Sequence, residues 1–118
     1  IVTLNQDGLL QRAGCEVLEL HGNAFGERGS PRRPDVIWSD EELDPLRLEQ
    51  VFAWLGQCDS LVVLGTSSRL QPSCEFPLRA RGRARLIEIN PEETPLSSQC
   101  DECWRGAAED LLGRFLEQ

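Results

Sequence analysis

The chain has 118 residues and a formal net charge of −8, from 20 acidic and 12 basic residues. This length suits one small domain, so we expect residues 1–118 to form a single domain. The acidic balance argues against a direct nucleic-acid ligand. No stretch approaches the roughly 20 apolar residues of a membrane span, and no signal-peptide pattern opens the sequence. We therefore expect no membrane association and a cytoplasmic location.

The first third of the chain is predicted to contain two strands joined by a short helix. Residues 1–4 are predicted to lie within a strand and begin without an initiator Met, so we expect a fragment of a longer protein. Residues 9–13 follow a helical pattern that stops at Gly14, and residues 16–20 alternate Glu with Val and Leu as a strand does. Residues 22–34 contain the glycines, prolines and arginines typical of a loop, and residues 35–38 are predicted to be a short extended segment.

The remainder alternates helix and strand. Asp44-Pro45 marks a helix start, and the helical spacing of apolar residues continues to Gly56. Two apolar strands are predicted at residues 61–64 and 85–89, with a crossover helix at 72–80 between them and a terminal helix at 107–116. Strands and helices in this order predict an α/β fold, a Rossmann-like parallel sheet with flanking helices.

Polar residues follow the predicted strands directly. In open parallel α/β sheets, ligands bind beyond the carboxyl ends of the strands, so we expect these side chains to face one cleft. They are Asn5, Asp7, His21, Thr66, Ser67, Asn90 and Glu92.

Five cysteines occur, an odd number scattered among apolar segments, which favours reduced thiols over a disulfide framework. Cys100 and Cys103 have the spacing of half a zinc site, but a structural site needs four ligands. We therefore expect no bound metal. The arginines between Arg79 and Arg85 are interpreted as solvated rather than as an anion site.

Five short motifs in order resemble the sirtuins, a family of NAD-dependent protein-lysine deacylases. The opening segment is similar to the sirtuin pattern Thr-Gln-Asn-hydrophobic-Asp-x-Leu-His-x-x-Ala-Gly, and the others follow in register over nearly the whole chain. The motifs are Thr3–Leu9 with Arg12–Gly14, Val17–Gly22, Arg33–Trp38, Gly65–Ser67 with Gln71–Pro72, and Ile89–Glu92.

The resemblance implies NAD as cofactor, an acylated protein lysine as partner, and a role for each matching residue. His21 would be the general base acting on the NAD ribose hydroxyls, a task that suits an imidazole. Asn5 would assist at the ribose or hold a water, and Asp7 would hold the nicotinamide carboxamide. The remaining cofactor-binding residues would contact the phosphates and the adenosine ribose: Gly65, Thr66, Ser67, Asn90 and Glu92. The products would be nicotinamide, free lysine and O-acyl-ADP-ribose.

The sequence also departs from the family pattern. It contains no Gly-Ala-Gly-x-Ser segment and no paired-cysteine zinc module, since residues 22–34 hold no cysteine. Leu4 and Gln6 exchange the polar and apolar positions that flank Asn5 in the family pattern. Residues 39–41 replace the Phe-Gly-Glu that pairs with the substrate backbone. Two alternatives therefore stay open: a non-catalytic remnant that serves as an NAD-binding or interaction domain, and a protein ADP-ribosyltransferase.

Overall fold

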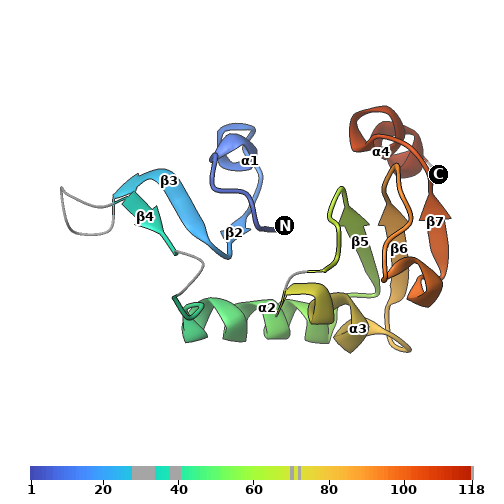
Figure 1. Ribbon diagram of the computed structural model, residues 1–118, viewed down its shortest axis with the longest axis horizontal. Helices are drawn as coiled ribbons and strands as arrows, with labels where there is room; N and C mark the ends of the chain where they lie inside the picture. Colours follow the sequence, from blue (N-terminus) through green and yellow to red (C-terminus); the bar gives the residue numbers. More distant parts are fainter. Residues whose placement is uncertain (28–33, 38–40, 70, 72, 118) are drawn as a thin grey trace. The chain divides into compact units, whose positions relative to one another are not determined.

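The computed structural model describes residues 1–27, 34–37, 41–69, 71 and 73–117. Its backbone divides into two compact units, Ile1–Ala53 and Trp54–Gln118, and each is described by itself (Figure 1). That all 118 residues form one domain stays a prediction. Among the described residues, no helix is both long enough and apolar enough to cross a bilayer.

The first unit begins with a short parallel strand pair, β1 (Val2–Thr3) and β2 (Leu18–Glu19), joined by helix α1 (Leu9–Arg12). This is the predicted strand–helix–strand order. The register pairs Val2 with Leu18 and Thr3 with Glu19, and the Leu20 amide extends the pairing by donating to the Thr3 carbonyl at 3.0 Å. Leu20 is fully buried, which anchors the end of β2.

The segment predicted to be a loop is partly strand. Strand β3 (Gly22–Glu27) pairs antiparallel with β4 (Pro34–Val36), and the register shifts between Asn23 and Glu27. The glycine-rich composition wrongly predicted a loop over the whole segment. Residues of low strand propensity form β3 because pairing with β4 satisfies their backbone hydrogen bonds. Residues 28–33, which belong to the same predicted loop, and 38–40 lie outside the described residues.

Helix α2 (Pro45–Gln57) begins where the sequence predicted. The Asp44 carboxylate accepts a hydrogen bond from the Leu46 amide at 2.9 Å, and its carbonyl accepts from the Leu48 amide at 3.1 Å. Proline at the first helical position loses no helical hydrogen bond. The buried residues Val51 and Leu55 lie on its apolar face.

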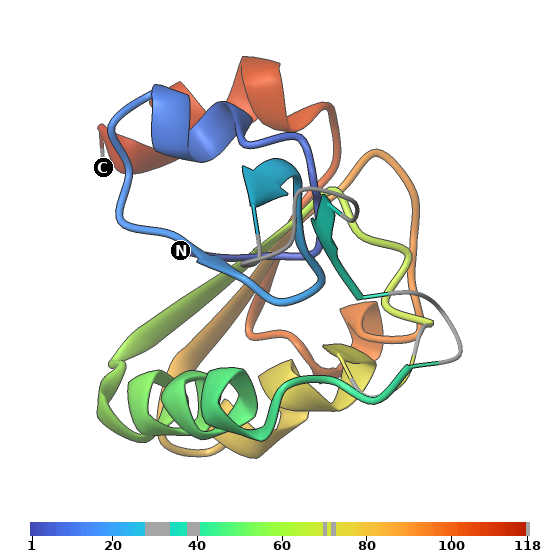
Figure 2. The same cartoon turned by 90° about the vertical axis from the view of Figure 1, so that its left-hand side faces the viewer.

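The second unit contains a three-stranded parallel sheet in the order β5 (Ser60–Leu64), β6 (Arg85–Ile89) and β7 (Glu102–Trp104). Between β5 and β6 the chain passes through a 3₁₀ turn, η1 (Ser73–Glu75), and helix α3 (Phe76–Ala80). A second 3₁₀ turn, η2 (Ser97–Gln99), precedes β7, and helix α4 (Ala108–Leu116) follows it. Figure 2 shows α3 and α4 on opposite sides of this sheet, which confirms the predicted Rossmann-like class.

Strand β6 forms the centre of that sheet and of its core. Leu86, Ile87 and Ile89 are almost wholly inaccessible to solvent, as expected for a parallel strand with neighbours on both edges and helices on both faces. Strand β7 was not predicted. Its residues Glu-Cys-Trp are too few and too polar to give a strand pattern, and they become a strand because the free edge of β6 pairs with them.

Candidate functional site

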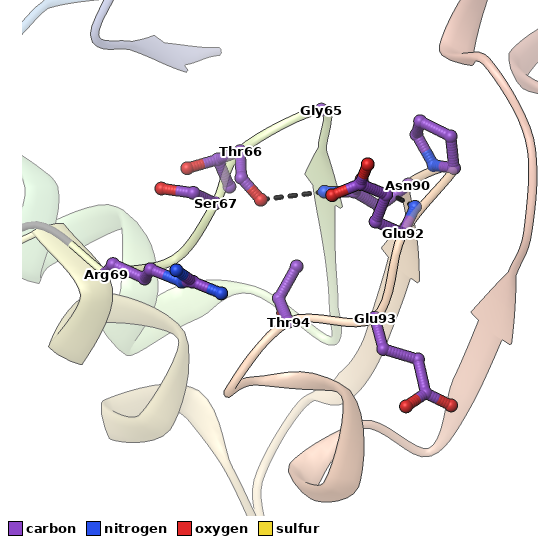
Figure 3. A pocket seen from close by; sticks show the side chains of 9 residues that line it. Gly65, Thr66, Ser67, Arg69, Asn90, Glu92, Glu93 and Thr94 are labelled. Carbon is purple, nitrogen blue, oxygen red and sulfur yellow. Dashed lines mark hydrogen bonds between the residues drawn. The ribbon is translucent and has the colours of Figure 1, made fainter.

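A cavity of about 350 Å³ opens at the carboxyl ends of β5 and β6 (Figure 3). One wall is the turn after β5 and the other is the loop after β6, so the parallel pairing of the two strands brings both turns to one edge. The lining residues include all five that the sequence predicted for this half of the site: Gly65, Thr66, Ser67, Asn90 and Glu92. Arg69, Pro91, Glu93 and Thr94 complete it.

The side chain of Asn90 holds the two walls together. Its Nδ2 donates to the Thr66 carbonyl at 2.7 Å, and its Oδ1 accepts from the Glu92 amide at 3.2 Å. Asn90 is 7% exposed, so the amide group is committed to these protein contacts. Sequence reasoning assigned Asn90 to a ligand, and the structure adds that it fixes the spacing of the cavity walls.

The turn after β5 has a backbone that favours glycine. Gly65 has a φ of 58°, and Ser68 also has a positive φ, 52°. Such left-handed residues cost other side chains roughly 1–2 kcal/mol. The turn is fixed by the Gly65 amide, which donates to the Ile89 carbonyl at 3.0 Å, and by the Ser68 amide, which donates to Thr66 Oγ1 at 3.2 Å. It therefore presents exposed polar groups from a defined backbone.

A buried carboxylate supports the second wall. Glu88 lies on β6 with no exposed surface and accepts hydrogen bonds from Thr94 Oγ1, from Ser97 Oγ at 2.5 Å and from Arg105 Nη1 at 2.8 Å. Burial of the carboxyl opposes its ionisation, but the three donors outweigh this and hold the pKa of Glu88 below its ordinary value of 4.5. Glu88 is therefore ionised at neutral pH.

Arg105 connects this buried charge to the cavity. The same Nη1 lies 3.4 Å from the Asn90 carbonyl and 3.2 Å from the Glu92 carbonyl, and Nη2 donates to Ser97 Oγ at 2.8 Å. Sequence reasoning missed the Glu88–Arg105 pair. The available signal was a lone carboxylate inside an otherwise apolar strand, since a charge in that position is almost always paired.

In the first unit, Asn5 and His21 leave the same edge of the β1–β2 pair. Thr3 and Glu19 are register partners, and Asn5 and His21 each follow two residues after one of them. Asn5 is exposed, and its amide donates to Thr3 Oγ1 at 3.1 Å. His21 is half-buried, and its carbonyl accepts a hydrogen bond from the Ile37 amide at 2.8 Å, which fixes the backbone that carries the imidazole.

Asp7 lines a second, smaller cavity of about 190 Å³. Its Oδ1 accepts from the Leu9 amide at 3.0 Å, and Arg12 Nη2 donates to its carbonyl at 2.9 Å. The guanidinium of Arg12 also lies 5.8 Å from the centre of the Phe25 ring. One carboxylate oxygen thus positions the start of α1, and sequence reasoning missed the partners Arg12 and Phe25.

Three predicted residues, Asn5, Asp7 and His21, lie in the first unit, and the other five lie in the second. That all of them face one cleft stays a prediction. Among the described residues, no cluster of three or more His, Cys, Asp or Glu side chains could hold a metal ion. All five cysteines are described, and none is in a disulfide.

No family model matches the chain. NAD-dependent protein deacylase 1 of Archaeoglobus fulgidus is 34% identical, over 98% of this chain and 58% of the relative. A deacylase of the same name from Caldanaerobacter subterraneus is 31% identical over 100% of this chain and 60% of the relative. The chain thus spans a little over half the length of these curated relatives. The second alignment extends over 145 positions against 118 residues here, so that relative has residues without a counterpart in this chain.

Solved structures of Sir2 proteins are also similar to this chain over nearly its whole length. A Sir2 homologue in complex with NAD is 29% identical, with a TM-score of 0.88 over 98% of this chain and 56% of the other. A Sir2 complex with a p53 peptide and NAD⁺ is 25% identical, with a TM-score of 0.86 over 98% of this chain and 61% of the other.

Proposed function

Because the chain belongs to the sirtuin family and matches part of its catalytic domain, we propose that it serves NAD-dependent removal of acyl groups from protein lysines. The products are nicotinamide, free lysine and O-acyl-ADP-ribose. The observation that carries this proposal is the cavity at the ends of β5 and β6, which gathers all five residues expected to bind the cofactor in this half of the chain.

The cavity suits part of a dinucleotide. Its volume of about 350 Å³ lies near the lower end of the range for small-molecule sites, which fits a ribose with a phosphate rather than a whole NAD. Exposed Ser67 offers a hydroxyl, and exposed Glu92 offers a carboxylate to ribose hydroxyl donors. Among the described residues, and apart from the two chain neighbours of Gly65, no atom lies within 4 Å of the place where a Cβ on Gly65 would lie, so the backbone is open to a ligand.

The residues divide into those that hold the cofactor and those that act during the reaction. Thr66, Ser67 and Glu92 hold phosphate and ribose, while Asn90 keeps the walls at the right separation. NAD, when bound, supplies a ribose carbon activated by the leaving group nicotinamide. Asp7 orients the carboxamide through the carboxylate oxygen that does not accept from the Leu9 amide.

His21 is assigned the proton transfer. Its imidazole would accept the proton of a ribose hydroxyl of bound NAD, which would prepare that oxygen to take over the acyl carbon as the bond from this carbon to the lysine nitrogen breaks. The hydrogen bond from the Ile37 amide to the His21 carbonyl fixes the backbone of His21, which supports a defined position for its side chain. Asn5 leaves the same strand pair and holds a ribose hydroxyl or a water.

A non-catalytic, NAD-binding remnant is the competing function. The exchange of Leu4 and Gln6 beside Asn5 favours it, because these positions flank a residue of the site. The experiment that distinguishes the two is isothermal titration with NAD, followed by assay of nicotinamide release from NAD in the presence of an acetyl-lysine peptide.

His21→Ala should abolish O-acyl-ADP-ribose formation, or lower it by about 10²- to 10⁴-fold, while NAD affinity barely changes. Ser67→Ala is the matched variant and should weaken binding first, because its hydroxyl contacts the ground-state cofactor. NAD binding without turnover by the unaltered chain would support the remnant. Joint loss of binding and thermal stability in His21→Ala would show that the histidine is structural.

A further inference from the structure

One cationic side chain in the β5–β6 cavity has no task in the function proposed above. Arg69 follows the Gly65–Ser68 turn, is exposed, and lines the cavity. Figure 3 shows its guanidinium reaching from this turn toward Thr94 on the opposite wall. Within the described residues, no hydrogen bond or ion pair is made by this guanidinium.

Three other arginines of the second unit have protein partners. Arg83 donates to the Leu55 carbonyl, Arg85 pairs with Glu102, and Arg105 pairs with Glu88. Those contacts tie strands and loops together. Arg69 instead points into the cavity (Figure 3), so no contact among the described residues accounts for its position.

Charged groups of opposite sign line different parts of the cavity. Glu92 lies beside Asn90 on the wall opposite Ser67, whereas the carboxylate of Glu93 points away from the centre of the cavity (Figure 3). A ligand would therefore meet the Arg69 guanidinium from the turn after β5 and the Glu92 carboxylate from the loop after β6. A ribose phosphate matches both groups, because its hydroxyls donate to a carboxylate and its phosphate oxygens accept from a guanidinium.

We propose that Arg69 binds a phosphate group of the nucleotide in this cavity and so contributes to the choice of nucleotide. This inference rests on the proposed function and adds a residue to it. Guanidinium favours phosphate because two of its N–H groups match two oxygens of the anion. Two sources fit the same chemistry: the pyrophosphate shared by NAD and ADP-ribose, and a 2′-phosphate on the adenosine ribose.

The test compares three ligands on the 118-residue chain at 0.15 M salt: ADP-ribose, 2′-phospho-ADP-ribose and adenosine, which has no phosphate. The variant is Arg69→Gln, with Arg81→Gln as its control. Arg81 is also exposed, and it follows helix α3 outside the cavity lining. Arg81→Gln therefore makes the same change of net charge without altering the cavity. Arg69→Lys tests whether charge alone suffices.

Arg69→Gln should weaken the binding of at least one phosphorylated ligand about tenfold and adenosine binding less than twofold, because the substitution removes a hydrogen bond between charged groups. Arg81→Gln should bind all three ligands as the unaltered chain does, and Arg69→Lys should recover part of the loss. An equal loss for both phosphorylated ligands identifies the pyrophosphate, and a loss confined to the 2′-phosphorylated ligand identifies the 2′-phosphate.

Two results would overturn the inference alone: unchanged binding of both phosphorylated ligands by Arg69→Gln, or an equal loss for adenosine, which would mean that Arg69 shapes the turn. Failure of the unaltered chain to bind any of the three ligands would reject the nucleotide site itself, and with it both this inference and the proposed function.

Discussion

Replacing Glu88 by Gln removes the buried charge that supports the loop after β6 and keeps the shape of the side chain. Glu88 has no exposed surface, and Thr94 and Ser97 both donate hydroxyl hydrogen bonds to it. A hydrogen bond to a charged group contributes about 1.5–3 kcal/mol and a neutral one about 0.5–1.5 kcal/mol, so each hydroxyl contact should lose about 1 kcal/mol. The third donor, Arg105, is 33% exposed, and solvent screening reduces what its contact adds.

We therefore expect Glu88→Gln to lower the free energy of unfolding at pH 7 by about 2 kcal/mol, which corresponds to a fall in Tm of roughly 8 °C for a chain of this length. Urea denaturation followed by tryptophan fluorescence measures this difference. Glu93→Gln is the control, because it removes one exposed carboxylate from the same loop and should change stability by less than about 0.5 kcal/mol.

The pH dependence provides a second test of the same reasoning. The pKa of Glu88 is lowered in the folded chain from 4.5, chiefly because the Ser97, Thr94 and Arg105 hydrogen bonds outweigh the opposing effect of burial. Its charge therefore stabilises the fold fully at pH values above 4.5, and this contribution is lost as the pH falls through the lower folded-state pKa. The difference between the unaltered chain and Glu88→Gln should shrink below pH 4. A difference under 0.5 kcal/mol at pH 7, or one that grows in acid, would refute the assignment of the charge.

Two further predictions concern the turn after β5 and the cysteines. Gly65→Ala should destabilise the chain by roughly 1–2 kcal/mol in urea denaturation through its positive φ alone, because the added Cβ meets no atom of the described residues within 4 Å apart from its chain neighbours. Gly56→Ala in helix α2 should be neutral or stabilising, and equal effects of the two substitutions would mean that the turn adapts. Alkylation with iodoacetamide at pH 8, read by peptide mass spectrometry, should modify exposed Cys103 well before Cys100, because burial, aided by the nearby Cys103 and Glu88, raises the pKa of Cys100 to about 12; faster labelling of Cys100 would contradict this.

Local sequence patterns predicted the elements whose determinants are local. Helix α2 begins at Pro45 because Asp44 caps it and proline suits its first turn, and both facts are visible in the sequence. Strands β5 and β6 were predicted at nearly their observed bounds because apolar residues predominate in both: residues 61–64 form a continuous apolar run, and Leu86, Ile87 and Ile89 are apolar around Glu88. Their parallel pairing followed from the helix between them, and the gathering of Gly65, Thr66, Ser67, Asn90 and Glu92 followed from that pairing.

Elements that depend on a distant partner were not predicted. Strand β7 exists because the edge of β6 accepts it, and β3 pairs with β4 despite its glycines. The same holds for the site. Glu88 was read as one position of an apolar strand, although its partner Arg105 lies 17 residues further along the chain.

The sequence by itself determined the family, the parallel α/β class and the residues that follow the strand ends, because each of these depends on short runs of residues and their order. Only the tertiary structure decided which side chains support those residues and which remain available to a ligand. Asn90 and Arg69 show the difference. The Asn90 amide is bound to the Thr66 carbonyl, while the Arg69 guanidinium faces the cavity without a partner among the described residues. Hydrogen-bond partners far apart in sequence are set by how strands and loops pack, which no local pattern records.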